Sequence, residues 1–190
     1  FSIAAALMCM IYALGDVSGA NFNPAVTAAI FMSGRCQDEA SVAAKYVLAQ
    51  IVGGITAAFT YVFIRRGDTF PLGPSEKYGW SQIAVAEIVF TFVLCYVVLS
   101  VAISEKTAAP EFFGLAIGSC VTVGGFAIGG ISGGSLNPAV SLGISCSHLG
   151  AVWTGIVYAL FEFTGAFVAS TAFKTTHAVD VDKESDKVAA

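Results

Sequence analysis

The sequence predicts an all-α membrane protein built as an inverted repeat: a bundle of membrane-spanning helices with two short half-helices. Three observations lead to this prediction. Hydrophobic residues make up 56% of the 190-residue chain, charged residues only 12%, and the mean hydropathy is +0.79, values that exclude an ordinary soluble domain. Several apolar segments are long enough to cross a bilayer. The tetrapeptide Asn-Pro-Ala-Val occurs twice, at 23–26 and 137–140.

The long apolar segments account for most of the chain. Each holds about 18 to 24 residues, enough to cross a hydrocarbon core of ~30 Å at ~1.5 Å per residue. They are residues 41–64, 81–103, 111–128 and 151–173, and a shorter fifth segment covers 1–14. Residues 174–190 are polar, and we expect them to form a disordered cytoplasmic tail.

The basic residues agree with that orientation. With the tail in the cytoplasm, six of the nine Lys and Arg residues lie on the cytoplasmic side, in line with the positive-inside rule. The six are Arg35, Lys45, Lys106, Lys174, Lys183 and Lys187. Whether the membrane is the plasma membrane or an intracellular, vacuolar-type membrane stays open.

The two repeated motifs predict half-helices. Residues 25–32 and 139–146 are apolar but only about eight residues long, so each helix would cross about half of a bilayer. Asparagine is a good N-cap and proline suits the first helical position. We therefore expect helices to begin at Asn23-Pro24-Ala25 and at Asn137-Pro138-Ala139. Placed end to end, two such half-helices make one full span.

The motifs belong to a longer repeat. Residues 16–30 and 130–144 align at a constant offset of 114 residues, and three long apolar segments lie between them. An odd number of crossings inverts the second copy relative to the first. We expect one channel-type domain over 1–173, with repeats at about 1–64 and 81–173. The second copy has one more segment before its half-helix, so we expect a first helix of the complete fold to lie upstream of Phe1.

Short glycine-bearing stretches, 18–22 and 132–136, lead into the half-helices. We expect both to be extended, because irregular backbone at bilayer depth must line a cavity or be buried in protein. The carbonyl groups that would line such a cavity belong to Gly19, Ala20, Asn21, Gly133 and Ser135.

Each motif asparagine is expected to cap its helix with the side-chain oxygen and leave its NH₂ group free to face a solute. Two half-helix N-termini would each present about +0.5 charge at the midplane, which repels cations. A water molecule held there by its oxygen cannot relay a proton.

The duplicated Ser-Gly-x-x-x-Asn-Pro-Ala pattern with inverted repeats resembles the aquaporin, or major intrinsic protein, family over the whole chain except the tail. The likeness extends to Gln50 in AQIVGG and to Glu87 in VAEIVFTF. It implies six spanning helices, two half-helices, a pore in each protomer, a homotetramer and no cofactor. It also implies that Gln50 and Glu87 are buried polar residues, with Glu87 supporting one pore loop.

The resemblance singles out Val140, because most family members carry Arg after the second motif. Matched spacing places the other constriction positions at Ile3, Gly125 and Gly134. This set is wide and apolar, so we expect it to admit glycerol, urea, ammonia or hydrogen peroxide; alternatively, an apolar constriction dewets and conducts poorly. Phe161-Glu162 replaces a Gly-Pro pair of the family, and for Glu162 we favour a buried structural role over a pore role.

The predicted function is a passive channel in the lipid bilayer for water and small neutral solutes that excludes protons. One alternative is a low-conductance structural or adhesion protein of the same fold. A coupled secondary transporter is a further one, with only Glu87 and Glu162 as intramembrane ionisable groups. The net charge of −4 argues against a nucleic-acid partner. The sequence shows no nucleophile–base pair, metal-ligand cluster or phosphate loop, so we expect neither an enzyme nor a metal site.

Overall fold

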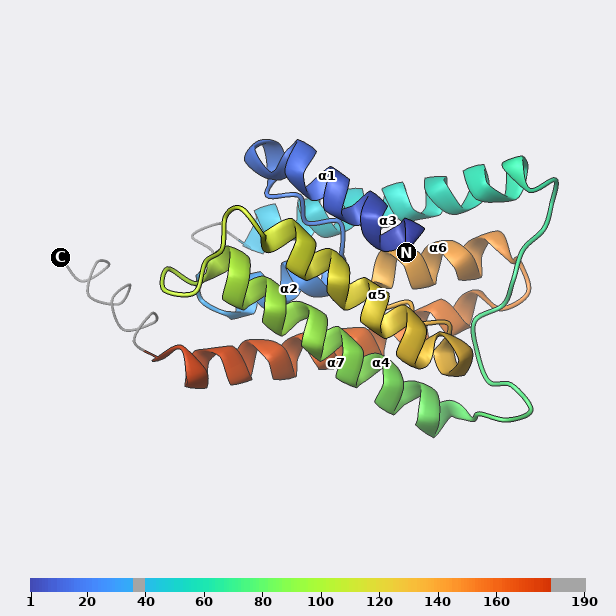
Figure 1. Ribbon diagram of the computed structural model, residues 1–190. Coiled ribbons are helices and arrows are strands. Elements are labelled where there is room, and N and C mark those ends of the chain that lie inside the picture. The colour runs from blue at the N-terminus through green and yellow to red at the C-terminus, as the bar shows by residue number, and fades with distance from the viewer. Residues whose placement is uncertain (36–39, 179–190) are drawn as a thin grey trace.

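The computed structural model describes residues 1–35 and 40–178, and this part of the chain is all-helical (Figure 1). The helices are α1 (Ser2–Ser18), α2 (Pro24–Met32), α3 (Ala40–Ile64), α4 (Trp80–Val98), the π-helical turn η1 (Leu99–Ile103) that continues α4, α5 (Phe113–Ser132), α6 (Pro138–Ser147) and α7 (Val152–Thr176). By length and composition, α3, α4 with η1, α5 and α7 can each cross a membrane. The expected all-α membrane fold is confirmed.

Helix ends differ from the expected ones where a cap, rather than hydropathy, stops the helix. Helix α1 continues to Ser18 and α5 to Ser132, and each ends at a glycine in the left-handed conformation, Gly19 (φ 70°) and Gly133 (φ 89°). Helix α7 runs on to Thr176, so the first residues of the expected tail, 174–176, continue this helix. The part of the expected tail at 179–190 lies outside the described residues.

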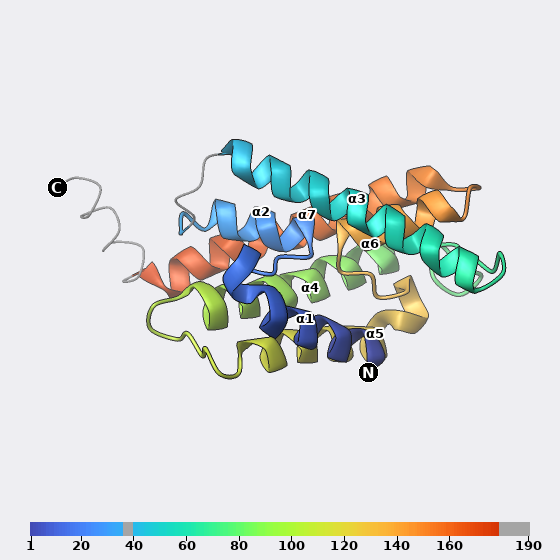
Figure 2. The same cartoon turned by 90° about the horizontal axis from the view of Figure 1, so that it is seen from above.

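The two half-helices form one composite span. In Figures 1 and 2, α2 and α6 lie end to end along the bundle, with their N-termini at its centre. Helix α3 packs along both of them, α2 and α6 also contact α7, and α4 packs against α5 and α7, while α1 packs against α5. The half-helices are therefore packed between α3 on one side and α7 on the other, with their N-termini at the middle of the molecule.

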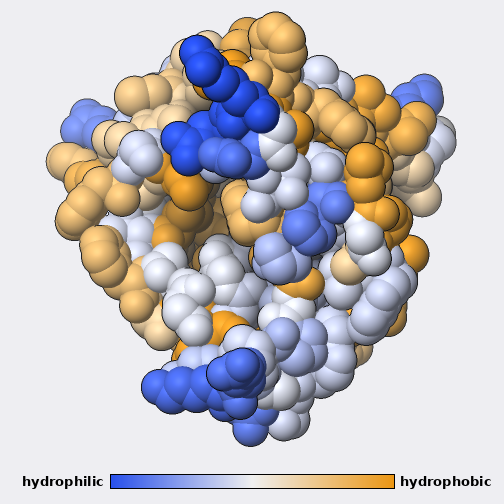
Figure 3. All heavy atoms as spheres, turned by 90° about the vertical axis from the view of Figure 1, so that its right-hand side faces the viewer, coloured by the Kyte–Doolittle hydropathy of each residue, from blue (hydrophilic) through white to orange (hydrophobic). Residues whose placement is uncertain are grey.

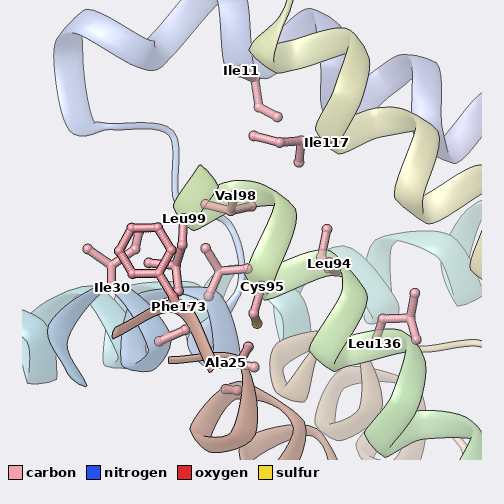
Figure 4. Close-up of a cluster of buried hydrophobic side chains, with 14 of the residues drawn as sticks. Ile11, Ala25, Ile30, Leu94, Cys95, Val98, Leu99, Ile117, Leu136 and Phe173 are labelled. Carbon is pink, nitrogen blue, oxygen red and sulfur yellow. The ribbon is translucent and has the colours of Figure 1, made fainter. Parts of the chain in front are cut away.

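An apolar core fills the space between α2, α4, α5 and α7 (Figure 4). Phe173 and Leu99 are fully buried there, and Leu136, from the loop before α6, closes one end of the cluster. Apolar side chains also cover much of the perimeter in the end view of Figure 3. Exposed apolar side chains on long helices suit contact with lipid, whose acyl chains do not penalise them. The chain is an integral membrane protein.

Helices α3 and α6 approach each other backbone to backbone. A Cβ atom added at Gly54 would lie 2.4 Å from the carbonyl oxygen of Ala139, and one added at Gly143 would lie 2.6 Å from the carbonyl oxygen of Gly54. Small residues at such crossings allow membrane helices to pack closely. By contrast, a Cβ atom at Gly53, the neighbouring residue on α3, would meet no atom within 4 Å.

Candidate functional site

Each half-helix begins at the asparagine of its motif. The side-chain oxygen of Asn23 accepts hydrogen bonds from the backbone N–H of Ala25 (2.9 Å) and Val26 (3.4 Å). The oxygen of Asn137 accepts one from the N–H of Ala139 at 2.9 Å. The prolines occupy the first helical position, where a missing N–H costs no helical hydrogen bond. The local sequence therefore explains why both helices start at the centre of the bundle.

The two asparagines also join the repeats. Asn23 Nδ2 donates to the carbonyl oxygen of Leu136 at 2.7 Å, and Asn137 Nδ2 donates to the carbonyl oxygen of Phe22 at 3.0 Å. The expectation that both NH₂ groups are free is wrong, because each donates one hydrogen bond to the loop of the other repeat. An amide nitrogen carries two donors, so these hydrogen bonds use one of the two N–H groups of each asparagine.

The loops that precede the half-helices turn sharply rather than extend. Gly19 and Ala20 both have positive φ (70° and 51°), as do Gly133 and Gly134 (89° and 64°) and then Leu136 (54°). The expected extended conformation is wrong because the chain must reverse direction between α1 and α2, and between α5 and α6, within a few residues. Left-handed backbone at a leucine is strained and needs support from its surroundings.

Glu87 of α4 supports the loop before α6. Its carboxylate accepts hydrogen bonds from Ser132 Oγ (2.6 Å), from the N–H of Ser135 (3.1 Å) and from the N–H of Leu136 (2.9 Å). The side chain is fully buried. A buried carboxylate with several donors satisfies backbone groups that would otherwise be unpaired at bilayer depth. Glu87 thus fixes the strained turn at Leu136.

Gln50 of α3 and Glu162 of α7 each contact the hydroxyl residue near the start of a half-helix. Gln50 Nε2 donates to the hydroxyl of Thr27 at 2.8 Å and to the carbonyl oxygen of Asn21. Glu162 Oε1 accepts from the hydroxyl of Ser141 at 2.8 Å. Thr27 and Ser141 each lie four residues after their motif asparagine. Glu162 is fully buried, whereas Gln50 is only half-buried and so is not the buried polar residue that was expected.

A cavity of about 670 Å³ runs along α1 and past both half-helix N-termini. Asn23 and Asn137 lie in its wall, and so do Ile3 and Val140, two of the four expected constriction residues. The other two, Gly125 and Gly134, are not among the lining residues; a Cβ atom at Gly134 would lie 3.5 Å from the Cα atom of Gly125. Of the expected carbonyl-bearing residues, four line the cavity and Gly133 does not: the four are Gly19, Ala20, Asn21 and Ser135.

Several polar groups of the site were not foreseen as such. The carbonyl groups of Phe22 and Leu136 bind the opposite asparagines, and the hydroxyls of Ser135 and Ser141 lie 2.6 Å apart. One signal in the sequence was available: a hydroxyl residue follows each motif asparagine by four positions. That spacing places the hydroxyl one helical turn above the N-cap.

The hydrogen bond from Asn23 to the Leu136 carbonyl predicts that two substitutions of Asn23 lower the stability by different amounts. Asn23→Ser keeps an N-cap side chain but cannot reach the Leu136 carbonyl, so we expect a loss of about 1–3 kcal/mol from an unpaired buried group. Asn23→Ala also removes the cap and should lose about 1 kcal/mol more. Thermal unfolding in detergent measures both variants against the wild type. A serine variant as stable as the wild type would show that the hydrogen bond to Leu136 contributes nothing to the stability.

Fold and site together define a class of protein: a helical membrane protein of two inverted repeats whose half-helices meet at a cavity in the middle of the helix bundle. The chain belongs to the major intrinsic protein family, whose sequence profile matches residues 1–173.

Individual relatives agree with this assignment. The chain is 37% identical over 172 residues to aquaporin NIP1-1 of Zea mays, covering 88% of this chain and 58% of the maize protein. It is 35% identical over 176 residues to nodulin-26 of Glycine max, with 92% and 63% of the two chains covered. A probable aquaporin, AqpM, of Archaeoglobus fulgidus is 34% identical over 184 residues, with 89% and 72% covered. The chain spans about three fifths of the length of the two plant relatives.

Proposed function

We propose that this protein forms a passive transmembrane channel for water and small neutral solutes. The observation that carries the proposal is the cavity of about 670 Å³ with Asn23 and Asn137 in its wall, where the two half-helices meet. Donors at helix N-termini, inside a space lined mostly by apolar side chains, suit single molecules that carry an oxygen acceptor. The names of the maize and archaeal relatives, both called aquaporins, support the same proposal.

In this proposal each asparagine offers its second N–H to the solute oxygen. The N-termini of α2 and α6 add a positive potential of about half a charge each. A water molecule held with its oxygen toward Asn23 and Asn137 turns its hydrogens away from the midpoint on both sides. The hydrogen-bonded chain of water is broken there, and proton transfer along it is suppressed.

Selectivity in this proposal depends on the apolar residues above the midpoint. Ile3 and Val140 lie in the cavity wall, and neither side chain offers a hydrogen-bond donor or a charge. The proposed constriction therefore has no charge and no hydrogen-bond donor that would exclude solutes larger than water. Glycerol, urea, ammonia and hydrogen peroxide are the solutes that we propose for it.

The experiment that tests the proposal is Val140→Arg in liposomes that contain the full-length protein. We expect the wild type to pass water, glycerol and urea, and the arginine variant to lose at least about tenfold in glycerol and urea flux while it retains water flux. The reason is that the long side chain narrows the cavity and adds donors suited to water. Stopped-flow light scattering under osmotic gradients of each solute measures the rates.

Val140→Leu is the matched control, because it adds volume without charge or donors. A similar loss of glycerol flux in the leucine variant would assign selectivity to width alone. If the wild type matches empty liposomes for every solute, the channel proposal fails.

That last result would favour the second candidate, a low-conductance structural or adhesion protein. The observation in its favour is that both Ile3 and Val140 in the cavity wall are apolar, since an apolar constriction can lose its water. A coupled transporter is less favoured, because neither intramembrane carboxylate, Glu87 or Glu162, is among the residues that line the cavity. We extend the channel proposal to a homotetramer in the bilayer, for which the exposed apolar perimeter offers contact surface.

A further inference from the structure

The N-terminus of α6 differs electrically from that of α2. Three successive backbone N–H groups before α6, those of Ser135, Leu136 and Asn137, donate to two buried carboxylates, Glu87 and Glu162. Before α2, within the described residues, the side chain that reaches the loop from a neighbouring long helix is the neutral amide of Gln50. Carboxylates therefore contact the loop before α6, whereas an amide contacts the loop before α2.

The two carboxylates are not equivalent. Both oxygens of Glu87 accept hydrogen bonds, so this group is satisfied as an ionised acceptor. In Glu162, Oε1 accepts from the Asn137 N–H at 2.9 Å and from Ser141 Oγ at 2.8 Å. Its Oε2 is buried and has no hydrogen-bond partner among the described residues. Two carboxylates in one dry site do not readily ionise together, so Glu162 is the one that can carry a proton.

A chain of hydroxyl groups connects Glu162 to the cavity. Ser141 Oγ lies 2.8 Å from Glu162 Oε1 and 2.6 Å from Ser135 Oγ, and Ser135 is a wall residue of the cavity. Ser141 Oγ donates to Glu162 Oε1 in this structure, so release of a proton from Glu162 first requires the Ser141 hydroxyl to turn until it accepts from the carboxyl group and donates to Ser135. The carboxyl proton then passes to Ser141, Ser141 passes its own proton to Ser135, and Ser135 passes one to water in the cavity. Both hydroxyls end unchanged, and one proton has moved from Glu162 to the water.

The charge of Glu162 outweighs the helix dipole at this point. The N-terminus of α6 presents about +0.5 charge, whereas an ionised carboxylate carries −1 and is bonded directly to the Asn137 N–H. The two half-helix N-termini together present about +1 charge, which the ionised Glu87 offsets, so ionisation of Glu162 changes the local potential at the midpoint from near neutral to negative. A near-neutral midpoint does not compensate a cation for its lost hydration, whereas a negative one attracts cations.

We propose that Glu162 determines specificity for charge: when its carboxylate is ionised, small monovalent cations pass the midpoint, and when it is protonated they are excluded. This inference rests on the proposed channel function. Val140 contributes to it, since no cationic side chain stands at that position to repel the same ions.

The other titratable groups around Glu162 are few, and we infer that Glu162 is the one whose charge changes between about pH 6 and about pH 8. From α4, Glu87 and the thiol of Cys95 interact with it electrostatically, and Tyr158 does so from α7 itself. Helix α2 and the turn η1, which also contact α7, contain no titratable residue. Cys146, the titratable residue of α6, lies near the far end of that helix from Asn137. The exposed Asp16 lines the cavity on α1 and is common to every variant tested.

The test uses the full-length protein in planar bilayers under a KCl gradient, at about pH 6 and about pH 8, with K⁺ as the probe. We expect a cation-selective current in the wild type that rises on the order of tenfold with pH, a change of about 1.4 kcal/mol in the barrier. Glu162→Gln, which keeps the shape and the acceptor, should reduce the current to the level of empty bilayers at both pH values. Glu111→Gln makes the same change at an exposed loop position and should behave as the wild type.

Water flux, measured on the same preparations, separates the two proposals. Normal water flux together with a K⁺ current that is absent, insensitive to pH, or equal in Glu162→Gln overturns the role of Glu162 and leaves the channel intact. Absence of both water flux and current in the wild type overturns both. If Glu162→Gln loses water flux as well, the variant cannot test the inference, and the wild-type protein is used instead. A wild-type K⁺ current that does not rise with pH then overturns the inference.

Discussion

Gly54→Ala is expected to destabilise the protein by about 2–4 kcal/mol, although it adds a single methyl group. The new Cβ atom would lie 2.4 Å from the backbone carbonyl oxygen of Ala139, and a backbone atom inside a helix cannot move aside cheaply. Helices α3 and α6 would have to separate, and α6 would carry the cap at Asn137 away from the midpoint. The melting temperature in detergent and the water flux of liposomes should therefore fall together.

The adjacent Gly53 supplies the matched control. Gly53→Ala makes the same change on the same helix, where the added methyl group meets no atom within 4 Å. It should be neutral or slightly stabilising, because alanine favours a helix over glycine by up to about 1 kcal/mol. Equal melting temperatures for the two variants would show that the close crossing of α3 and α6 has no energetic importance.

Glu87→Ala is expected to have the second large effect. It would leave two buried N–H groups and the hydroxyl of Ser132 without their acceptor. At about 1–3 kcal/mol for each unpaired group, the expected loss is about 3–6 kcal/mol. The left-handed turn at Leu136 would also lose its support. We expect little folded protein after purification, measured by size-exclusion chromatography and thermal unfolding, and water flux near background.

Glu87→Gln refines this prediction. Its side-chain oxygen can still accept hydrogen bonds, but its NH₂ group must face one of the backbone donors, so we expect an intermediate loss of about 1–3 kcal/mol. Glu111→Ala, at an exposed position, should leave stability unchanged. If Glu87→Ala melts with the wild type, the carboxylate does not hold the loop.

Much of the fold could be predicted because its signals are local. Hydropathy located the long helices, and the Asn-Pro pairs located the starts of α2 and α6. Where the helices end depends on backbone geometry at Gly19 and Gly133, which hydropathy does not report. The turn η1 stayed inside a predicted span, because its five residues, Leu99–Ile103, are as apolar as the α-helix before them.

The site was less predictable because its contacts join distant parts of the chain. The asparagines could be recognised by their motif, but the carbonyl groups that bind them belong to the opposite repeat. Gly125 and Gly134 were placed by spacing alone, and spacing does not say whether a backbone faces the cavity or another backbone. The contact of Glu162 with Asn137 depends on how α7 packs beside α6, which no local pattern encodes.

The reciprocal bonds of Asn23 and Asn137 also bear on the order in which the protein is made. They join residues 113 and 115 positions apart, so the midpoint cannot form while the second repeat is still unmade. Contacts of such long range close late in folding, after the local helices exist. A nascent chain that has inserted only its first repeat holds a complete α2 but has no acceptor for Asn23. In the proposed channel, the passage between the two sides is completed only when the second repeat docks on the first.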